Sequence, residues 1–269
     1  MKFCDSHCHL DFSEFDSCRA QVLERCKALS VARLVVPSVK RKWWGRVLDL
    51  ASKHEVIDAA LGLHPYFVDE HLLSDLADLE CIIKNRRDSI VAIGEIGVDS
   101  YIGRMDRQKL LFTSQLSLAE KYHLPVILHA RKMHSYVAGE LKKIEVPVGI
   151  VHAYSGSFEQ LSQYLKIGFY IGVGGVITFE GSTKTRAAIA RAPLESLVLE
   201  TDSPDMRVNV DTNDKRFFVD SVQSVSMSRP EYVVKVFESL CEIRPESPEV
   251  IATQLWENAR SALQLSKIE

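Results

Sequence analysis

Short apolar runs alternate along the chain with longer stretches of helical periodicity. Eight runs are rich in apolar and β-branched residues and recur at fairly even spacing, at positions 2–9, 33–39, 56–64, 89–98, 125–131, 148–152, 168–173 and 196–202. Between them, segments such as 14–29, 72–83 and 108–122 repeat apolar residues every three or four positions, as one face of a helix requires. Ser13 and Ser157 stand where a side chain caps the first turn of a helix. The pattern predicts eight strands that alternate with helices.

Regular alternation of strands and helices is typical of a parallel sheet covered by helices. Eight such units in 269 residues match a closed (β/α)8 TIM barrel, which takes about 250 residues. The alternative is an open doubly wound sheet, but no Gly-x-Gly-x-x-Gly turn follows the first run. No segment has the composition of an interdomain linker, so we expect residues 1–269 to form one α/β barrel domain.

One segment, 203–228, departs from the alternation. It follows the eighth run, is polar, and is long for a loop within a compact domain. Barrel topology would place it on the active face, so we predict an insertion that selects substrate and adds little to stability. Its acidic residues, among them Asp211 and Asp214, would repel a long polyanion. Phe217 and Phe218 are expected to attach the segment to the barrel or to contact substrate.

Composition narrows the class of protein. Apolar residues make up 46% and charged residues 26%, which is typical of a globular chain and excludes a disordered one. The apolar stretches are shorter than the roughly 20 residues that cross a bilayer, and no signal peptide precedes the first run, so we expect a cytoplasmic protein. A net charge of −3 argues against a broad electrostatic grip on nucleic acid. The six cysteines contain no Cys-x-x-Cys pair and are expected to be reduced thiols.

The first run ends in Asp5-Ser-His7-Cys-His9. Alternate residues of a strand face the same side, so Asp5, His7 and His9 are expected to point together, and Cys8 away from them. Two imidazoles on one face suit a transition metal, whereas two polar residues on an exposed strand are the other interpretation. Asp5 is placed to orient one imidazole through its ring N–H.

Four other runs carry a potential ligand at or near their C-terminal ends: Glu95, His129, His152 and Asp202. Active sites of TIM barrels lie at the C-terminal ends of the strands, so these side chains would share one level of the barrel with the two histidines of the first run. Taken singly, each could be a hydrogen-bonded core histidine or a strand-end ion pair. Together they exceed one tetrahedral site and indicate two metals that share a bridging ligand.

Six motifs now form a recognisable set: Asp5-Ser-His7-Cys-His9, Gly62-Leu-His64-Pro65, Gly94-Glu95-Ile-Gly97-Val-Asp99, Leu128-His129-Ala-Arg131, His152-Ala-Tyr-Ser155-Gly156 and Glu200-Thr201-Asp202-Ser-Pro204. In this order they resemble the TatD family of metal-dependent hydrolases, and its YjjV-like subgroup in particular. The resemblance implies a TIM barrel, a two-metal centre and, as in the best-known members, deoxyribonuclease activity. It further implies that one metal is held by His7, His9, Glu95 and Asp202. The other would be held by His129 and His152, with Glu95 bridging the two.

Three further residues at the ends of the runs, His64, Arg131 and Tyr154, are predicted to contact substrate. Basic and aromatic residues also collect in the loops of the same face, for example in 40–44 and 66–67. Cations contact phosphates and aromatic rings stack on bases, although packing within the helix layer would explain the same residues.

The leading hypothesis is hydrolysis of a phosphodiester by hydroxide bound between two divalent cations, with Asp202 orienting or deprotonating the water. Zn or Mn is favoured by the four histidines, and Mg is an option for activity. The substrate would be DNA, single-stranded or short, cleaved by a 3'-5' exonuclease, or a small phosphoester. We expect no membrane association and no obligate protein partner.

Two alternatives remain. The same hydroxide would attack an acyl ester or amide, including the ester of a D-aminoacyl-tRNA. Amidohydrolases that resemble this barrel often bridge their metals with a carboxylated lysine, whereas this chain has Glu95 and no lysine in its fourth run. The other alternative is a non-catalytic metal-binding protein, which the full set of six ligands disfavours.

Overall fold

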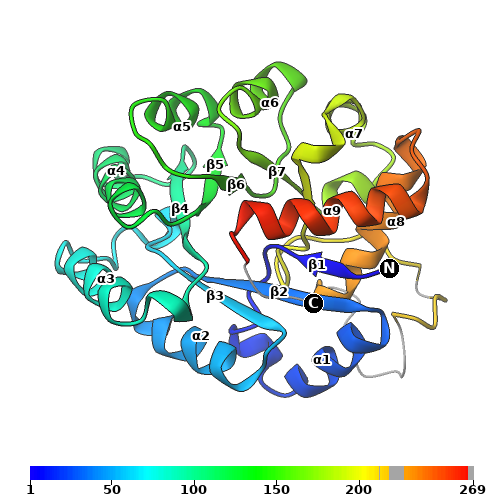
Figure 1. Cartoon of the computed structure of the whole chain (residues 1–269), viewed down its shortest axis with the longest axis horizontal. Coiled ribbons are helices and arrows are strands. Elements are labelled where there is room, and N and C mark those ends of the chain that lie inside the picture. The colour runs from blue at the N-terminus through cyan, green and yellow to red at the C-terminus, as the bar shows by residue number, and fades with distance from the viewer. Residues whose placement is uncertain (212, 218–226, 266–269) are drawn as a thin grey trace.

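Eight parallel strands make up one sheet in the order in which they follow one another along the chain (Figure 1). They were identified in a computed structural model that describes residues 1–211, 213–217 and 227–265. The strands are β1 (Phe3–Asp5), β2 (Val31–Ser38), β3 (Ile57–Leu61), β4 (Ala92–Asp99), β5 (Val126–Arg131), β6 (Gly149–Val151), β7 (Tyr170–Val173) and β8 (Leu197–Leu199). Each of the eight predicted runs overlaps one of these strands, so the predicted parallel sheet is confirmed.

The first and last strands meet and nearly close the sheet into a barrel. The amide N–H of Ser6 donates to the carbonyl oxygen of Leu199 at 2.9 Å, and that of His9 donates to Ser203 at 2.7 Å. A parallel bridge between Cys8 and Ser203 continues this contact beyond the regular strands. The TIM barrel is therefore confirmed over the open doubly wound sheet, whose first and last strands would stay apart.

Helices ring the barrel, as the periodicity predicted (Figure 1). They are α1 (Arg19–Ala28), α2 (Arg41–Lys53), α3 (Ser74–Asn85), α4 (Met105–Tyr122), α5 (His134–Leu141), α6 (Phe158–Leu165), α7 (Thr183–Arg191), α8 (Val233–Ile243) and α9 (Pro248–Ala262). Ser157 caps α6 by accepting the backbone N–H of Gln160. Ser13 caps nothing, because its hydroxyl donates to Glu14 and a short 3-10 turn precedes the start of α1.

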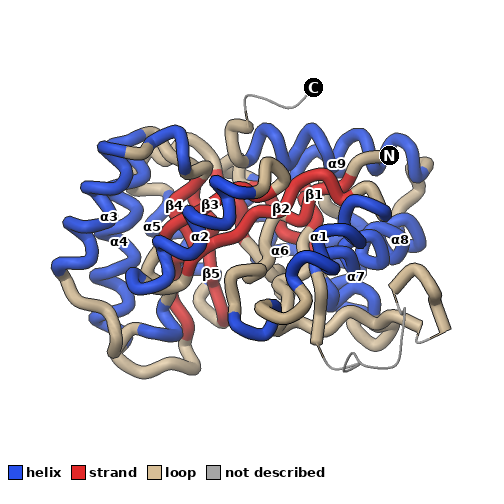
Figure 2. Tube along the Cα trace, turned by 90° about the horizontal axis from the view of Figure 1, so that it is seen from below, coloured by secondary structure: helices blue, strands red, loops and turns tan. Residues whose placement is uncertain are grey.

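Helix α9 covers the end of the barrel where the strands begin, and Figure 2 shows it lying along that side of the sheet. Its apolar residues pack on one inward-facing side chain from nearly every strand. This inner layer contains Cys4, Val35, Ala60, Ala92, Ile127, Ile150 and Val198, with Ala259, Ala262, Leu263 and Leu265 from the helix end. Apolar side chains therefore fill the end of the barrel where the strands begin, and the end where the strands finish is the one open to a site.

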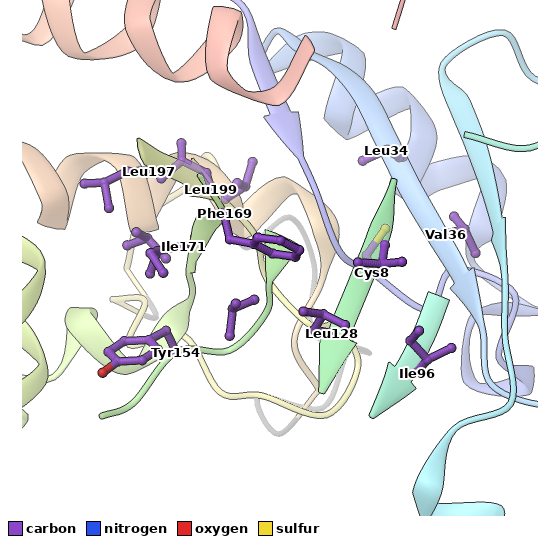
Figure 3. Packing of buried hydrophobic residues seen from close by; sticks show 14 of the residues in the cluster. Cys8, Leu34, Val36, Ile96, Leu128, Tyr154, Phe169, Ile171, Leu197 and Leu199 are labelled. Atoms are coloured by element: carbon purple, nitrogen blue, oxygen red, sulfur yellow. The ribbon is translucent and has the colours of Figure 1, made fainter. Parts of the chain in front are cut away.

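The residues that alternate with this inner layer face the helices. Leu34 and Val36 flank the inward Val35, and Leu128 follows the inward Ile127, so β2 and β5 are apolar on both faces. Figure 3 shows Leu34, Val36 and Leu128 among the buried side chains of this outer core. This packing holds the strand ends in fixed relative positions, which a multi-residue site requires.

The segment after β8 is attached to the barrel more firmly than its composition indicates. Val208 and Phe217 are buried in the main core, and the carbonyl oxygen of Phe217 accepts hydrogen bonds from Arg25 and Arg229. Phe217 thus attaches the segment to the barrel, as expected, whereas the expectation that the rest of the segment adds little to stability is wrong for Val208. Phe218 lies outside the described residues, as do 212 and 219–226.

The acidic character of this segment is partly neutralised. Asp214 forms an ion pair with Arg216 at 2.6 Å, and the same guanidinium also binds Glu238. Repulsion of a polyanion by Asp214 is therefore weaker than the sequence suggested. None of the helices in the described part of the chain has the length and apolarity needed to cross a membrane.

Candidate metal centre

Four predicted ligands from three separate strand ends meet at the open end of the barrel. Nε2 of His7 lies 3.3 Å from Nε2 of His9, 3.2 Å from Oε2 of Glu95 and 3.5 Å from Oδ1 of Asp202. Nε2 of His9 lies 3.6 Å from the same Glu95 oxygen and 3.4 Å from the same Asp202 oxygen. We call these four atoms the first donor set.

The other carboxylate oxygen of Glu95 belongs to a second donor set. Oε1 lies 3.0 Å from Nδ1 of His129 and 2.7 Å from Nε2 of His152, and those two nitrogens are 3.2 Å apart. Glu95 is thus the one residue with an oxygen in each set, which is the position expected of a bridging ligand.

The spacing of the first set fits a metal ion. Ligand atoms about 2.0–2.2 Å from a tetrahedral metal lie about 3.3–3.6 Å from one another. The printed separations in the first set run from 3.2 to 3.6 Å. Nitrogen lone pairs this close to each other and to two carboxylates repel unless a proton or cation lies among them. Imidazole and carboxylate donors are also the types that transition metals prefer.

A local irregularity in β4 turns Glu95 toward the centre. Ala92 faces the barrel interior, so in a regular strand Gly94 would also face inward and Glu95 outward. The pairing of β4 with β5 shifts register between Ile93 and Ile96, and this shift reverses the alternation at Glu95. Gly97 allows β4 to lie close to β5 after this shift, because a Cβ at this position would overlap the carbonyl oxygen of His129.

The two histidines of the second set need no irregularity. His129 follows the inward Ile127 by two residues, and His152 follows the inward Ile150 by two. Both therefore continue the inner face of their strands, one level above the apolar inner layer that α9 covers.

Hydrogen bonds fix which ring nitrogen of two ligands is free. Nδ1–H of His9 donates to the carbonyl oxygen of Pro37 at 3.1 Å, which leaves Nε2 as the donor atom for a metal. Nε2–H of His129 donates to Oδ2 of Asp99 at 3.0 Å, which leaves Nδ1 for the second set. Asp99 is therefore a positioning residue that the sequence analysis assigned no role, although it lies four residues beyond Glu95 at the end of β4.

His64 lies at ligand distance but its hydrogen bonds exclude it from the donor sets. Its Nδ1 accepts the backbone N–H of Tyr66 at 3.1 Å, so the neutral ring carries its proton on Nε2. That Nε2–H donates to Oε1 of Glu95 at 2.8 Å. Burial lowers the pKa of His64 to about 4, which keeps the ring neutral. His64 thus orients the carboxylate that both sets share.

Asp5 supports the backbone of the site instead of an imidazole. Its Oδ1 accepts the backbone N–H of His7 at 3.2 Å and of Thr201 at 2.9 Å, and its Oδ2 accepts the Thr201 hydroxyl at 2.6 Å. The prediction that Asp5 orients a ring is not met, and these bonds join β1 to the chain after β8. Cys8 is buried, as expected, with its thiol directed toward the carbonyl oxygen of Val35.

Opposite charges within the donor sets compensate one another. Burial alone would raise the pKa of Glu95, but His152, His64 and His7 around it hold that pKa well below its usual range. Burial alone would lower the pKa of His152, and Glu95 beside it raises that pKa to about 10. A cation bound here therefore competes with a proton on His152.

Asp202 is the ligand of the first donor set that is most accessible to solvent. Its side chain is 13% exposed, compared with 0% for His7, 5% for His9 and 3% for Glu95. Its backbone adopts a left-handed conformation with φ of 52°, which aspartate tolerates better than most residues. Its N–H donates to the carbonyl oxygen of His7 at 2.8 Å. The carboxylate therefore lies at the edge of the site that faces the mouth of the barrel.

The other predicted substrate contacts have different outcomes. Arg131 is exposed at the end of β5, and its guanidinium lies 4.5 Å from the ring centroid of Tyr101. It stays available to an anionic substrate. Tyr154 is 1% exposed and its hydroxyl donates to the carbonyl oxygen of Ser157 at 2.5 Å, so this placement does not fit substrate contact.

Glu200 is a further buried carboxylate that the sequence analysis did not single out as a site residue. It lies beneath the second donor set, with Oε1 4.0 Å from Nδ1 of His152, and it accepts the backbone N–H of Ala153. Burial raises its pKa to about 7. Its position two residues after the inward Val198 is the signal that alternation along β8 would have given.

Comparison with known proteins agrees with this fold. The family model described as "TatD related DNase" matches residues 4–264. The "uncharacterized metal-dependent hydrolase YjjV" of Escherichia coli K12 is 40% identical over 260 residues, which are 96% of each chain. The crystal structure of the TatD homologue YjjV from the same organism has a TM-score of 0.90 at 38% identity, over 97% of this chain and 98% of that one.

A more distant relative carries a more specific name. The "3'-5' ssDNA/RNA exonuclease TatD" of Rahnella sp. is 28% identical over 266 residues, covering 96% of this chain and 97% of that protein. Because the family model and a relative of 40% identity both span nearly the whole barrel, this chain belongs to the TatD family and is a metal-dependent hydrolase.

Proposed function

We propose that this protein hydrolyses phosphodiesters of single-stranded or short nucleic acid at a centre of two divalent cations. The observation that carries the proposal is Glu95, which presents one carboxylate oxygen to each donor set. The names of the family and of the Rahnella exonuclease support the choice of substrate class.

The first cation would be held by His7, His9, Glu95 and Asp202, and the second by Glu95, His129 and His152. Together, the four imidazoles and two carboxylates of the two donor sets favour Zn or Mn over Mg, which prefers oxygen ligands. When bound, such cations lower the pKa of water and neutralise charge on a phosphoryl oxygen.

The protein side chains supply orientation and proton transfer. Oδ1 of Asp202 faces the two histidines of the first set, and the carboxylate lies at the exposed edge, so it is placed to accept a proton from an attacking water. His64 donates to Glu95 and fixes the shared carboxylate. Arg131, two residues beyond His129 on β5, offers a cation to the phosphate backbone of the substrate.

A substrate panel tests the proposal. Metal-defined protein would be assayed side by side on single-stranded DNA, RNA, a phosphomonoester and an acyl ester. Cleavage of the two nucleic acids with little turnover of the others supports it. The same panel is run on Asp202→Asn, which should lose the cleavage. Its matched control is Asp205→Asn, which removes an exposed carboxylate three residues away. Acyl-ester turnover that exceeds nucleic-acid cleavage would overturn the proposal in favour of a deacylase or esterase.

A further inference from the structure

We propose that a wall of aromatic side chains beside the metal centre stacks against the bases of a single-stranded nucleic acid. The wall consists of Phe12, Trp43, Phe67 and Tyr66. The inference rests on the proposed function, because it names how that substrate would be recognised.

The rings form an unbroken series that starts at a residue of the first donor set. The ring of Phe12 is stacked on that of His9, with centroids 4.7 Å apart and planes at 17°. Trp43 meets Phe12 edge-on at 5.4 Å, Phe67 meets Trp43 at 5.9 Å, and Tyr66 meets Phe67 at 5.3 Å. The wall therefore leads from the donor atoms outward to solvent.

All four rings lie on the active face because each follows a strand. Phe12 comes after β1, Trp43 lies in the first turn of α2 after β2, and Phe67 and Tyr66 lie in the 3-10 turn Pro65–Phe67 after β3. In a TIM barrel these are the loops that contact substrate.

A buried cation holds the wall in place. Lys40 is 6% exposed, and its ammonium lies 3.9 Å from the ring centroid of Phe67 and 4.3 Å from that of Trp43. Both carboxylate oxygens of Glu70 accept from this ammonium, at 2.9 and 3.1 Å. Fixed rings lose less conformational freedom when a base stacks on them, which favours binding.

Exposure distinguishes the wall from ordinary core packing. The neighbouring Trp44 is 2% exposed, and its indole N–H donates to the carbonyl oxygen of Gly62 at 3.1 Å, so it is a structural residue. Phe12, Trp43 and Phe67 keep part of their ring surface exposed, and Tyr66 is 62% exposed. Stacking tolerates any base, and each stacked base typically strengthens binding about tenfold. A chain of net charge −3 gains little affinity from general electrostatics, so such contacts matter more.

The test compares tetrathymidylate with an abasic tetramer that has the same phosphates and sugars. For binding, both carry methylene phosphonate linkages, which keep the charge and have a CH2 group in place of the bridging oxygen that would leave on hydrolysis. Fluorescence anisotropy with the as-purified protein should show at least tenfold tighter binding of the tetramer with bases. Trp43→Leu should reduce this preference at least fivefold, whereas Trp43→Phe should retain most of it. Trp256→Leu, at the opposite end of the barrel, is the matched control.

The outcomes separate the wall from the hydrolase. Equal binding of the two tetramers by the wild-type protein would contradict stacking on the wall. An equal loss of affinity for both tetramers in Trp43→Leu would also contradict it, because it would show that the ring only supports the position of His9. Should Trp43→Leu fail to fold, Tyr66→Leu replaces it, because that side chain is mostly exposed. Cleavage of ordinary tetrathymidylate is measured in parallel. Cleavage without base preference refutes the wall alone, and base preference without cleavage refutes the proposed function alone.

Discussion

Replacing Asp99 by asparagine should weaken the second donor set and leave the first intact. Asp99 is buried and serves two donors at once: Oδ2 accepts Nε2–H of His129 at 3.0 Å, and Oδ1 accepts the backbone N–H of Tyr101 at 2.8 Å. An asparagine has a single acceptor oxygen, so neither orientation of its amide satisfies both donors. The orientation that keeps the Tyr101 bond points an NH2 group at Nε2–H of His129.

The magnitude follows from what His129 must then do. Its ring either loses its positioning bond or moves its proton to Nδ1, the atom that lies 3.0 Å from Oε1 of Glu95. The first change leaves a donor of the second set poorly oriented and the second removes it, and loss of such a positioning partner typically costs 10–100-fold in metal affinity. That corresponds to about 1.4–2.7 kcal/mol. His7, His9 and Asp202 have no contact with Asp99 among the interactions described, so the first set should keep its affinity.

The assay is a Zn titration of metal-stripped protein followed by competition with a chromogenic chelator. We expect two binding steps in the wild-type protein. In Asp99→Asn, the Zn affinity of one step should fall 10–100-fold and that of the other should stay unchanged. Asp69→Asn, which removes an exposed carboxylate on the same face, is the control. If Asp99→Asn bound both equivalents like the wild type, or weakened both equally, the division of ligands into two sets would be refuted.

Three further predictions follow from single contacts. Asp202→Asn should lower kcat/KM on a cleaved substrate at least 100-fold, because an amide is a poor base, while the melting temperature stays within a few degrees; a loss of less than threefold would remove Asp202 from the chemistry. Phe217→Ala should lower the free energy of unfolding by about 3–5 kcal/mol in urea titrations, since this ring is fully buried; a change below 1 kcal/mol would show that the segment after β8 is not anchored there. Gly97→Ala should weaken Zn binding and lower the melting temperature, because its Cβ would collide with the backbone of His129, and a protein with both properties unchanged would contradict this packing.

The barrel could be predicted because alternation of strands and helices repeats along the whole chain. The exact residue at which each strand ends could not be predicted. The run 2–9 was predicted as one strand, whereas β1 ends at Asp5. Beyond it, His7 and His9 face the barrel centre although Cys4 lies in the apolar inner layer one level below. Regular alternation cannot place both, and the chain leaves the regular strand after Asp5, between Cys4 and His7.

The candidate ligands could be predicted because they stand at strand ends, and the surrounding residues could not. The part played by Asp99 depends on how β4 and β5 pair, which no local pattern shows. Tyr154 was misplaced because Ala153 adopts a positive φ of 47°, so the chain after His152 no longer alternates as a strand does. For Phe217 the attachment to the barrel was predicted but its partner was not, since Arg25 is 192 residues away in sequence.

Whether Glu95 bridges two metal sites can be measured from the metal stoichiometry of three proteins: the wild type, His129→Ala and Glu95→Ala. Each would be saturated with Zn, dialysed against metal-free buffer and analysed for its elemental content. If Glu95 is a shared ligand, the wild type should hold about two equivalents per chain, His129→Ala about one, and Glu95→Ala well below one. A wild type that binds a single equivalent, or a Glu95→Ala variant that retains one at full affinity, would show that Glu95 does not bridge two sites.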